Sequence, residues 1–175
     1  MRKILAKEFF NRDTALVAQE LLGKFLVRKI DGKEVAVMIT ETEVYDGPDD
    51  LASHASKGKT QRTEIMFGHP GNFYVYLVYG MHEMVNIVTR EHGYPAAILI
   101  RGGVTEDLQL NGPGKVTKFL TINRALNNKP AKKSTGLWLE DRGVKVSKFQ
   151  KLPRVGVAYA GPIWSAKKLR FLWEI

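Results

Sequence analysis

The spacing of apolar positions predicts β-strands along most of the chain. Apolar and polar side chains alternate over residues 25–30 and 34–45, and the turn formers Asp31 and Gly32 lie between them, so these segments are expected to form a β-hairpin. Further strands are expected where β-branched, aromatic and aliphatic residues cluster, at residues 73–79, 84–90, 96–101, 137–140, 154–158 and 169–173.

Two short helices are expected between these strands. Asp13 is suited to cap a helix over residues 14–22, with Gly23 as its C-terminal stop. Pro113 predicts the start of a second helix, over residues 114–123. Short helices between mostly sequential strands are typical of a single α+β domain.

The composition narrows the class of protein. The chain has 175 residues and no Cys, which excludes disulfide scaffolds, Cys-ligated zinc sites and thiol nucleophiles. Apolar residues make up 44% of the chain, which argues against disorder. The longest apolar runs are too short to cross a membrane, and Lys7 and Glu8 come before a signal-peptide core is reached. We therefore expect a cytoplasmic globular protein without a membrane partner, associated with the nucleoid in a bacterium.

The net charge of +9 is unevenly distributed along the chain. Residues 1–110 carry 13 basic and 15 acidic side chains, whereas residues 111–175 carry 14 basic and 3 acidic ones. A one-sided basic surface is typical of a protein that binds a polyanion, most often a nucleic acid. A solvated surface that keeps the protein soluble explains the same charges equally well.

The strand predicted over residues 34–45 carries candidate chemistry. Its apolar face ends at Ile39 and continues, by the two-residue period of a strand, into Glu41, Glu43 and Tyr45. Inward-facing carboxylates are rare unless they are paired or used in chemistry. Two carboxylates at this spacing lie roughly 6.5–7 Å apart, near the separation in inverting glycoside hydrolases. A strand that leaves the core at this point, with both carboxylates solvated, is the alternative.

The aromatic strand offers a second group of candidates. A hairpin loop of residues 80–82 sets Tyr76 opposite Asn86, and an aromatic ring beside an amide can stack on a planar ligand and test its edge. Tyr79 and Met81 then lie at the hairpin tip, where an apolar side chain can insert between stacked bases. Packing in the core or at its rim is the alternative for these tyrosines.

Metal and phosphate sites have little support in the sequence. The four histidines form no His-x-His or His-x-x-x-His pair, and no nucleotide-binding glycine loop is present, so neither a metal nor a cofactor is expected. Gly112-Pro113-Gly114-Lys115 opens a predicted helix, where backbone N–H groups and Lys115 could hold a phosphate. A plain helix entrance explains the same residues.

In combination, these segments resemble the alkyladenine DNA glycosylase family, the mammalian-type 3-methyladenine DNA glycosylases. The resemblance runs in order through nearly the whole chain. It is carried by Glu8-Phe9-Phe10, Leu21-Leu22-Gly23, Glu41-Thr42-Glu43-Val44-Tyr45 with Gly47-Pro48 and His54, Met66-Phe67, Tyr74-Val75-Tyr76 through Tyr79-Gly80-Met81 with Asn86, Leu99-Ile100-Arg101, Gly112-Pro113-Gly114-Lys115 and Arg154-Val155-Gly156-Val157.

The resemblance implies a fold and a catalytic group. The expected fold is a single glycosylase domain over residues 1–175, with a curved, mostly antiparallel sheet, a protruding hairpin and surrounding short helices. Glu43 is similar to the base that activates a water, and Arg101 and the backbone carbonyl near Val157 are expected to position that water. Glu41 has no catalytic role in the family.

The resemblance also implies how the substrate is held. Tyr45, His54 and Tyr76 are expected to form the pocket for the flipped base, and Asn86 to crowd the exocyclic amine of guanine. Tyr79, backed by Met81, is expected to fill the gap left in the duplex, and Lys115 to hold a phosphate. Residues 102–111 and the end of the chain are shorter than is usual in the family, so its peripheral DNA contacts are not expected to carry over.

The function implied is that of a monofunctional, monomeric glycosylase without cofactor or metal. It is expected to excise alkylated or deaminated purines from double-stranded DNA and to leave an abasic site. The residues leave three alternatives open: a non-catalytic basic nucleic-acid-binding domain, a metal-dependent hydrolase that uses Glu41, Glu43 and His54, and a small-molecule glycosidase that uses both glutamates.

Overall fold

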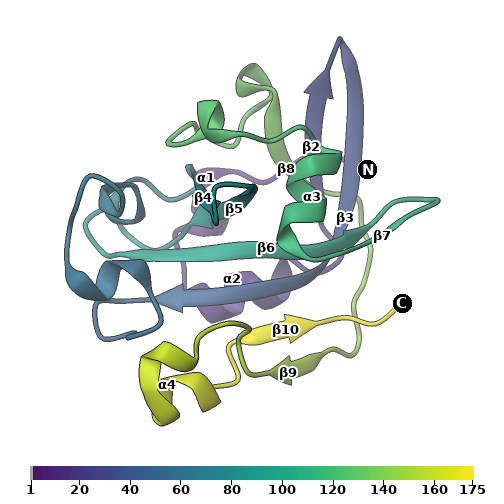
Figure 1. The fold of residues 1–175 in the computed structure, drawn as a ribbon. Helices are drawn as coiled ribbons and strands as arrows, with labels where there is room; N and C mark the ends of the chain where they lie inside the picture. The colour runs from purple at the N-terminus through teal and green to yellow at the C-terminus, as the bar shows by residue number, and fades with distance from the viewer. Residues whose placement is uncertain (1) are drawn as a thin grey trace.

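Antiparallel strands make up the centre of the structure, a computed structural model that describes residues 2–175 (Figure 1). Within those residues, ten strands form one sheet with the main path β1-β8-β2-β3-β6-β5-β4, while β7 pairs with β6, and β10 pairs with both β3 and β9. The strands are β1 (Lys3–Ile4), β2 (Phe25–Ile30), β3 (Lys33–Asp46), β4 (Phe73–Val78), β5 (His82–Val88), β6 (Ala96–Val104), β7 (Gln109–Asn111), β8 (Leu137–Asp141), β9 (Gln150–Leu152) and β10 (Arg170–Leu172). The helices are α1 (Lys7–Phe10), α2 (Thr14–Glu20), α3 (Pro113–Phe119) and α4 (Gly161–Ala166). The expected α+β fold is confirmed, and the sheet is not closed into a barrel.

Local signals place the first hairpin and the first capped helix where the sequence predicts them. β2 and β3 pair around Asp31 and Gly32, whose φ angles of 47° and 80° form the tight turn. The Asp13 carboxylate accepts a hydrogen bond from the Leu16 backbone N–H at 2.9 Å and so caps α2. The helix ends at Glu20, two residues before the predicted end, and Gly23 lies three residues beyond it with a φ of 77°.

β3 changes its neighbour and its inward face part way along. Its first half pairs with β2, whereas from Glu41 on it pairs with β10. Its register against β6 shifts on either side of Glu41, which marks a β-bulge. Ile39 before the bulge and Val44 after it both lie in the core, so Glu43 and Tyr45 face the other way. The prediction that the apolar face ending at Ile39 continues into the glutamates is therefore wrong.

The hairpin of β4 and β5 turns earlier than the sequence predicts. Its loop begins at Tyr79, which adopts a positive φ of 51°. The next residue, Gly80, also has a positive φ, of 66°. Asn86 therefore lies opposite Tyr74, and Tyr76 lies opposite Met84. The predicted pairing of Tyr76 with Asn86 is wrong by two residues, an even shift that keeps their side chains on one face of the hairpin.

The late elements agree only in part with the predictions. β8 and β10 confirm two of the three late strands. Residues 154–158 do not form a strand, because Arg154 is held in the interior by its side chain and a 3₁₀ turn begins at Ala158. α3 ends at Phe119, four residues before the predicted end, and Thr121 adopts a φ of 50° that is incompatible with a helix.

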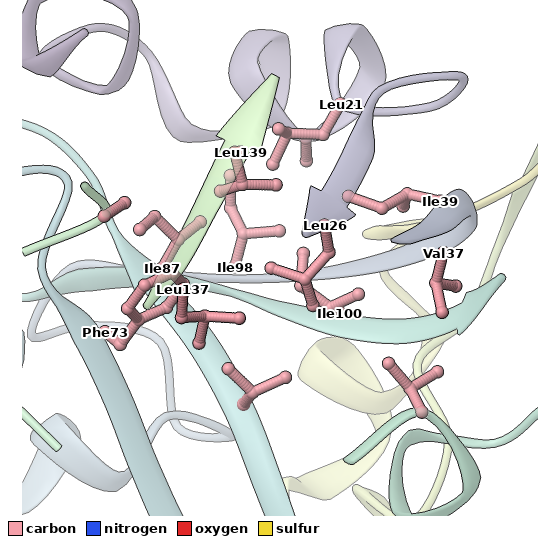
Figure 2. Close-up of a cluster of buried hydrophobic side chains, with 14 of the residues drawn as sticks. Leu21, Leu26, Val37, Ile39, Phe73, Ile87, Ile98, Ile100, Leu137 and Leu139 are labelled. Atoms are coloured by element: carbon pink, nitrogen blue, oxygen red, sulfur yellow. The ribbon is translucent and has the colours of Figure 1, made fainter. Parts of the chain in front are cut away.

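The hydrophobic core lies between the sheet and the helices α2 and α3. Aliphatic side chains of β2, β3, β6 and β8 meet there with those of α2 and of the β4–β5 hairpin (Figure 2). The side chains labelled in the figure are Leu21, Leu26, Val37, Ile39, Phe73, Ile87, Ile98, Ile100, Leu137 and Leu139. No helix in residues 2–175 is long and apolar enough to cross a membrane.

The basic surplus after residue 110 divides between arginines and lysines. All four arginines of this part pair with carboxylates of the protein, in the pairs Arg124–Glu83, Arg142–Glu140, Arg154–Asp50 and Arg170–Glu41. The ten lysines are exposed, and Lys133 pairs with Glu34. The solvent-facing basic charge of this part therefore lies mainly on lysines, although the Arg124 side chain is also 62% exposed.

Candidate active site

A pocket of about 440 Å³ opens where β3, β4, β5 and β6 meet the loop that follows β9. This volume lies within the usual range for sites that bind small molecules. The side chains that line it are Glu43, Tyr45, Ala52, His54, Arg62, Met66, Tyr74, Tyr76, Leu77, Val78, Tyr79, Met84, Asn86, Leu99, Arg101, Pro113, Val155, Gly156, Val157 and Tyr159. The pocket thus brings together residues that are expected from the sequence and others that are not.

Glu43 is the buried carboxylate of this pocket. Its side chain has no solvent-exposed surface, so the alternative in which this carboxylate is solvated is wrong. Its Oε1 accepts a hydrogen bond from the Tyr45 hydroxyl at 2.8 Å, and its Oε2 accepts one from the Val155 backbone N–H at 3.0 Å. Because each carboxylate oxygen has two acceptor positions, Oε1 retains one for a further donor such as a water.

Two arginines and a second carboxylate lie beside Glu43. The Arg101 Nε lies 3.5 Å from Glu43 Oε2 and donates a hydrogen bond to Glu41 Oε1 at 3.1 Å. Arg170 donates to the same Glu41 oxygen at 2.7 Å. The side chains of Glu41 and Arg101 are only 12% and 17% exposed, so these charges interact with little screening by water.

Aromatic side chains form the other walls. The rings of His54 and Tyr76 meet edge to face at 4.8 Å, and the rings of Tyr74 and Tyr76 lie 5.1 Å apart. The Arg62 guanidinium lies 5.2 Å from the centre of the Tyr76 ring. Tyr45 completes the group, with its hydroxyl on Glu43. The structure thus brings the three predicted pocket residues Tyr45, His54 and Tyr76 together around one space.

Burial controls the ionisation of these walls. Burial, helped by the Arg62 guanidinium, lowers the pKa of His54 to about 4, so its ring is neutral at neutral pH. Burial and then the Glu43 carboxylate raise the pKa of Tyr45. Burial also raises the pKa of Tyr76. The pocket therefore presents neutral rings and a neutral hydroxyl donor near neutral pH.

Asn86 is fixed at the floor of the pocket. Its side chain is 2% exposed, and its amide nitrogen donates to the Tyr74 carbonyl at 3.0 Å. This bond across the hairpin follows from the register that sets the two residues opposite each other. The side chain is therefore held in one position in the pocket lining.

The hairpin tip carries the two predicted wedge residues. Tyr79 is 88% exposed and Met81 is 72% exposed, so both large side chains face solvent at this tip. Gly114 at the start of α3 packs close to the His82 ring, so the predicted phosphate residue Lys115 lies near this hairpin with its side chain exposed. The N-terminus of the seven-residue α3 has Gly112 as its N-cap.

The segment after β9 closes the pocket through a buried ion pair. Arg154 and Asp50 have no exposed side-chain surface, and Arg154 Nη2 donates to Asp50 Oδ1 at 2.8 Å. Arg154 also donates to the Val44 carbonyl at 2.7 Å. This anchor holds the next residue, Val155, against Glu43. The predicted water contact, the Val157 carbonyl, accepts a hydrogen bond from the Ala160 N–H, and Val157 lies in the lining.

Several residues of the site are missing from the sequence prediction. They are Arg62, Met66, Tyr74, Tyr159 and the pair of Asp50 with Arg154. Tyr74 shares a strand face with Tyr76, which is a signal that could have identified it. The hydroxyl of Tyr74 lies 3.1 Å from the ring nitrogen Nδ1 of His54.

His, Asp and Glu are the residues of this chain that could ligate a metal ion. In residues 2–175, His, Asp and Glu side chains form no group of three that could hold a metal ion. The metal site of Glu41, Glu43 and His54 considered from the sequence is therefore not assembled. Glu41 and Glu43 instead pair with arginine.

The chain is similar to known proteins over most of its length. A family model described as methylpurine-DNA glycosylase matches residues 8–174. Proteins of Methanocella arvoryzae, an Anaeromyxobacter species and Rickettsia felis, each named provisionally as a 3-methyladenine DNA glycosylase, are 45%, 44% and 46% identical to the chain. These alignments cover 90%, 97% and 88% of the chain and 86%, 89% and 86% of the relatives.

Proposed function

The chain belongs to the methylpurine-DNA glycosylase family, and from that premise we propose that its pocket holds a damaged purine turned out of double-stranded DNA while Glu43 activates the attacking water. Membership confirms the resemblance expected from the sequence. The protein is a DNA glycosylase, a hydrolase of N-glycosidic bonds that acts in DNA repair. A non-catalytic nucleic-acid-binding domain is thereby set aside.

The aromatic walls support the proposal that a base enters the pocket. The glycosidic bond lies inside a duplex, and exposure of the nucleotide costs a few kcal/mol of stacking and pairing. Stacking on an aromatic ring returns roughly 1–3 kcal/mol per base. Tyr45 and Tyr76 offer such faces, and an electron-poor alkylated purine stacks on them well. Damaged bases pair and stack less well in DNA, so less free energy is needed to expose them.

The environment of Glu43 supports its role as the base. The water oxygen bonds to C1′, the C1′–N bond breaks, and its electron pair leaves with the purine. Glu43 takes the proton of the water, and its charge stabilises the positive charge that develops on the sugar. A purine alkylated at N3 or N7 is cationic and leaves as a neutral base, whereas a deaminated purine must gain a proton. No lysine acts as a nucleophile in this scheme, so the product is an abasic site.

The exposed hairpin tip and the lysine surface support the proposed DNA contacts. Tyr79, backed by Met81, inserts where the damaged nucleotide has left the stack. Lys115 and the other exposed lysines after residue 110 bind phosphates, which makes affinity fall steeply with salt. Arg101 and the Val157 carbonyl help to orient the water. A monomer suffices for this scheme, because every group named belongs to one chain.

The observation that carries this function is the fully buried Glu43 carboxylate at the pocket. The test is Glu43→Gln in single-turnover excision from a duplex with one 3-methyladenine or hypoxanthine. We expect base release to fall by 10²–10⁴-fold, the usual contribution of a general base, while duplex affinity stays within a few fold. The control is Glu34→Gln, which removes a carboxylate from the same strand outside the pocket lining, where it pairs with Arg2 and Lys133. Full turnover by Glu43→Gln would refute the assignment.

A further inference from the structure

Glu41 is the strongest unexplained feature of the molecule, because it is a nearly buried carboxylate that has no role in the proposed chemistry. Its Oε1 accepts hydrogen bonds from Arg101 Nε at 3.1 Å and from Arg170 Nη1 at 2.7 Å. The two arginines come from β6 and β10, the strands on either side of β3. A single oxygen thus joins three strands at the edge of the pocket.

Arg101 is shared unequally between two carboxylates. Its Nε is closer to Glu41 Oε1, at 3.1 Å, than to Glu43 Oε2, at 3.5 Å. Only the contact with Glu41 is a hydrogen bond. Without Glu41, the guanidinium would be free to close on Glu43 in the bidentate geometry that arginine and carboxylate favour.

The position of Glu41 is fixed by the chain around it. A methyl group on Gly102, directly opposite on β6, would lie 3.2 Å from both Cβ and Oε2 of Glu41, so the side chain packs on bare backbone. Arg170 is fixed in turn, since its Nε donates to the Pro153 carbonyl at 2.8 Å. Pro153 comes two residues before Val155, which donates to Glu43.

The electrostatic effect of Glu41 on Glu43 depends on the other charged groups around Glu43. The titratable and charged groups packed around Glu43 are Glu41 and Tyr45 on β3, Tyr76 on β4, Arg101 on β6, Arg170 on β10, Arg154 and Tyr159 after β9, and Asp50 behind Arg154. Arg154 is neutralised by Asp50. Arg101 and Arg170 are left with Glu41 as the carboxylate that accepts their hydrogen bonds.

We propose that Glu41 is a positioning residue that holds Arg101 away from a full ion pair with Glu43, and that Arg170 offsets the charge of Glu41. Arg101 then remains close enough to orient a water, while Glu43 keeps its capacity to accept a proton. The inference rests on the proposed role of Glu43 as the base.

The first test compares pH–rate profiles of single-turnover excision. In Glu41→Gln, Arg101 moves onto Glu43 and favours its ionised form, so the acidic limb moves lower by about one pH unit and the rate at neutral pH falls about 3- to 10-fold. In Arg170→Gln, the uncompensated Glu41 moves the acidic limb higher by about the same amount. Arg170→Lys keeps the cation and is expected to restore the limb. DNA affinity stays unchanged in all three variants, because none of these groups faces DNA in the proposal.

The second test reads the position of Arg101 without any turnover. The ¹H–¹⁵N signal of its Nε–Hε group, assigned by its loss in Arg101→Lys, is expected to shift in Glu41→Gln toward the position of a bidentate ion pair. Gly102→Ala is expected to shift it as well, because the added methyl group displaces the Glu41 carboxylate without a change in charge. Glu34→Gln is the control and is expected to leave both the signal and the pH profile unchanged.

The outcomes separate this inference from the function on which it rests. The positioning role is wrong if the acidic limb of the pH–rate profile stays in place in Glu41→Gln and Arg170→Gln. It is also wrong if the Nε–Hε signal of Arg101 does not shift in Glu41→Gln. If Glu43→Gln retains activity while the Arg101 signal still shifts, the assigned base is wrong but the contact geometry stands. If thermal melting shows that Glu41→Gln does not fold, the comparison of Arg170→Gln with Arg170→Lys decides the question.

Discussion

The Tyr45 hydroxyl donates a hydrogen bond to Glu43 Oε1 at 2.8 Å, from a position two residues along the same strand. The bond joins the aromatic wall of the pocket to its carboxylate. Because burial and the Glu43 charge raise the pKa of Tyr45, the hydroxyl keeps its proton well into the alkaline range. One side chain thus lines the pocket with its ring and holds the proposed base with its hydroxyl.

Tyr45→Phe separates these two roles. The ring remains for stacking, but Glu43 loses a donor in a buried site, which costs about 1–3 kcal/mol. We expect single-turnover excision to slow by roughly 5- to 100-fold, with DNA affinity within a few fold of the wild-type value. The matched control is Tyr94→Phe, a tyrosine outside the pocket lining. A large loss of affinity with an unchanged rate would contradict this division of roles.

His54 makes the fold sensitive to acid. Its pKa is about 4 in the folded protein, below the ordinary value near 6.5, so the unfolded chain binds a proton more readily. Its contribution to stability is complete above pH 6.5 and is lost as the pH falls toward 4. In the wild-type protein we expect this loss to amount to about 1–3 kcal/mol of unfolding free energy between pH 6.5 and 4. In His54→Gln we expect the loss to disappear, as measured by urea denaturation at each pH. His92→Gln, which changes an exposed ring, is the control; equal slopes in both variants would count against burial as the cause.

Tyr79 combines exposure with a strained backbone. Tyr79→Ala is expected to weaken duplex binding by roughly 5- to 100-fold, the value of one lost stacking contact, without a change in which base is excised. Tyr79→Gly is expected to bind as weakly, but to be more stable than the Ala variant by about 0.5–1 kcal/mol, since glycine adopts the φ of 51° without penalty. Fluorescence anisotropy and thermal melting measure the two effects. Unchanged binding by both variants would exclude insertion of this side chain.

Asn86 tests whether shape excludes guanine. Asn86→Ser shortens the side chain that the Tyr74 carbonyl now holds at the pocket floor, and so makes room for an exocyclic amine. We expect excision of guanine relative to a damaged purine to rise about 10-fold, the value of one steric contact in a pocket. The measurement is competition between duplexes. The control is Asn72→Ser, which changes a residue directly before β4 that does not line the pocket. The steric role fails if the ratio does not change.

The sequence predicts what depends on neighbours in the chain and misses what depends on distant partners. The β2–β3 turn and the capped helix α2 follow from residues a few positions apart. The β-bulge at Glu41 arises from mismatched pairing with β6, about 60 residues away, and it reverses which face of β3 points into the hydrophobic core. The local pattern therefore identifies Glu43 and Tyr45 as candidates but assigns them to the wrong side of the strand.

The ion pair of Arg154 with Asp50 is a second feature that no local pattern reveals, since 104 residues separate the two. In the sequence, Arg154 adds to a basic surplus that suggests phosphate binding. In the structure, it is fully buried and anchors the segment that carries Val155 to Glu43. A basic residue in this part of the chain thus supports the pocket from the protein interior.

This anchor leads to a prediction that separates stability from activity. Arg154→Met leaves the Asp50 charge buried and unpaired, and we expect it to lower the unfolding free energy by about 3–5 kcal/mol. The double variant Arg154→Met with Asp50→Leu removes both charges and is expected to recover most of that loss, because a buried ion pair contributes little beyond an apolar pair of similar size. Activity is expected to stay low in the double variant, since the hydrogen bond from Arg154 to the Val44 carbonyl is also gone and Val155 is no longer held against Glu43. The backbone N–H groups of Asp46 and Ala52 also lose the Asp50 carboxylate as their acceptor, which limits the recovery of stability. Urea denaturation and single-turnover excision are measured on the same preparations, and recovery of both together would show that the ion pair supports only the fold.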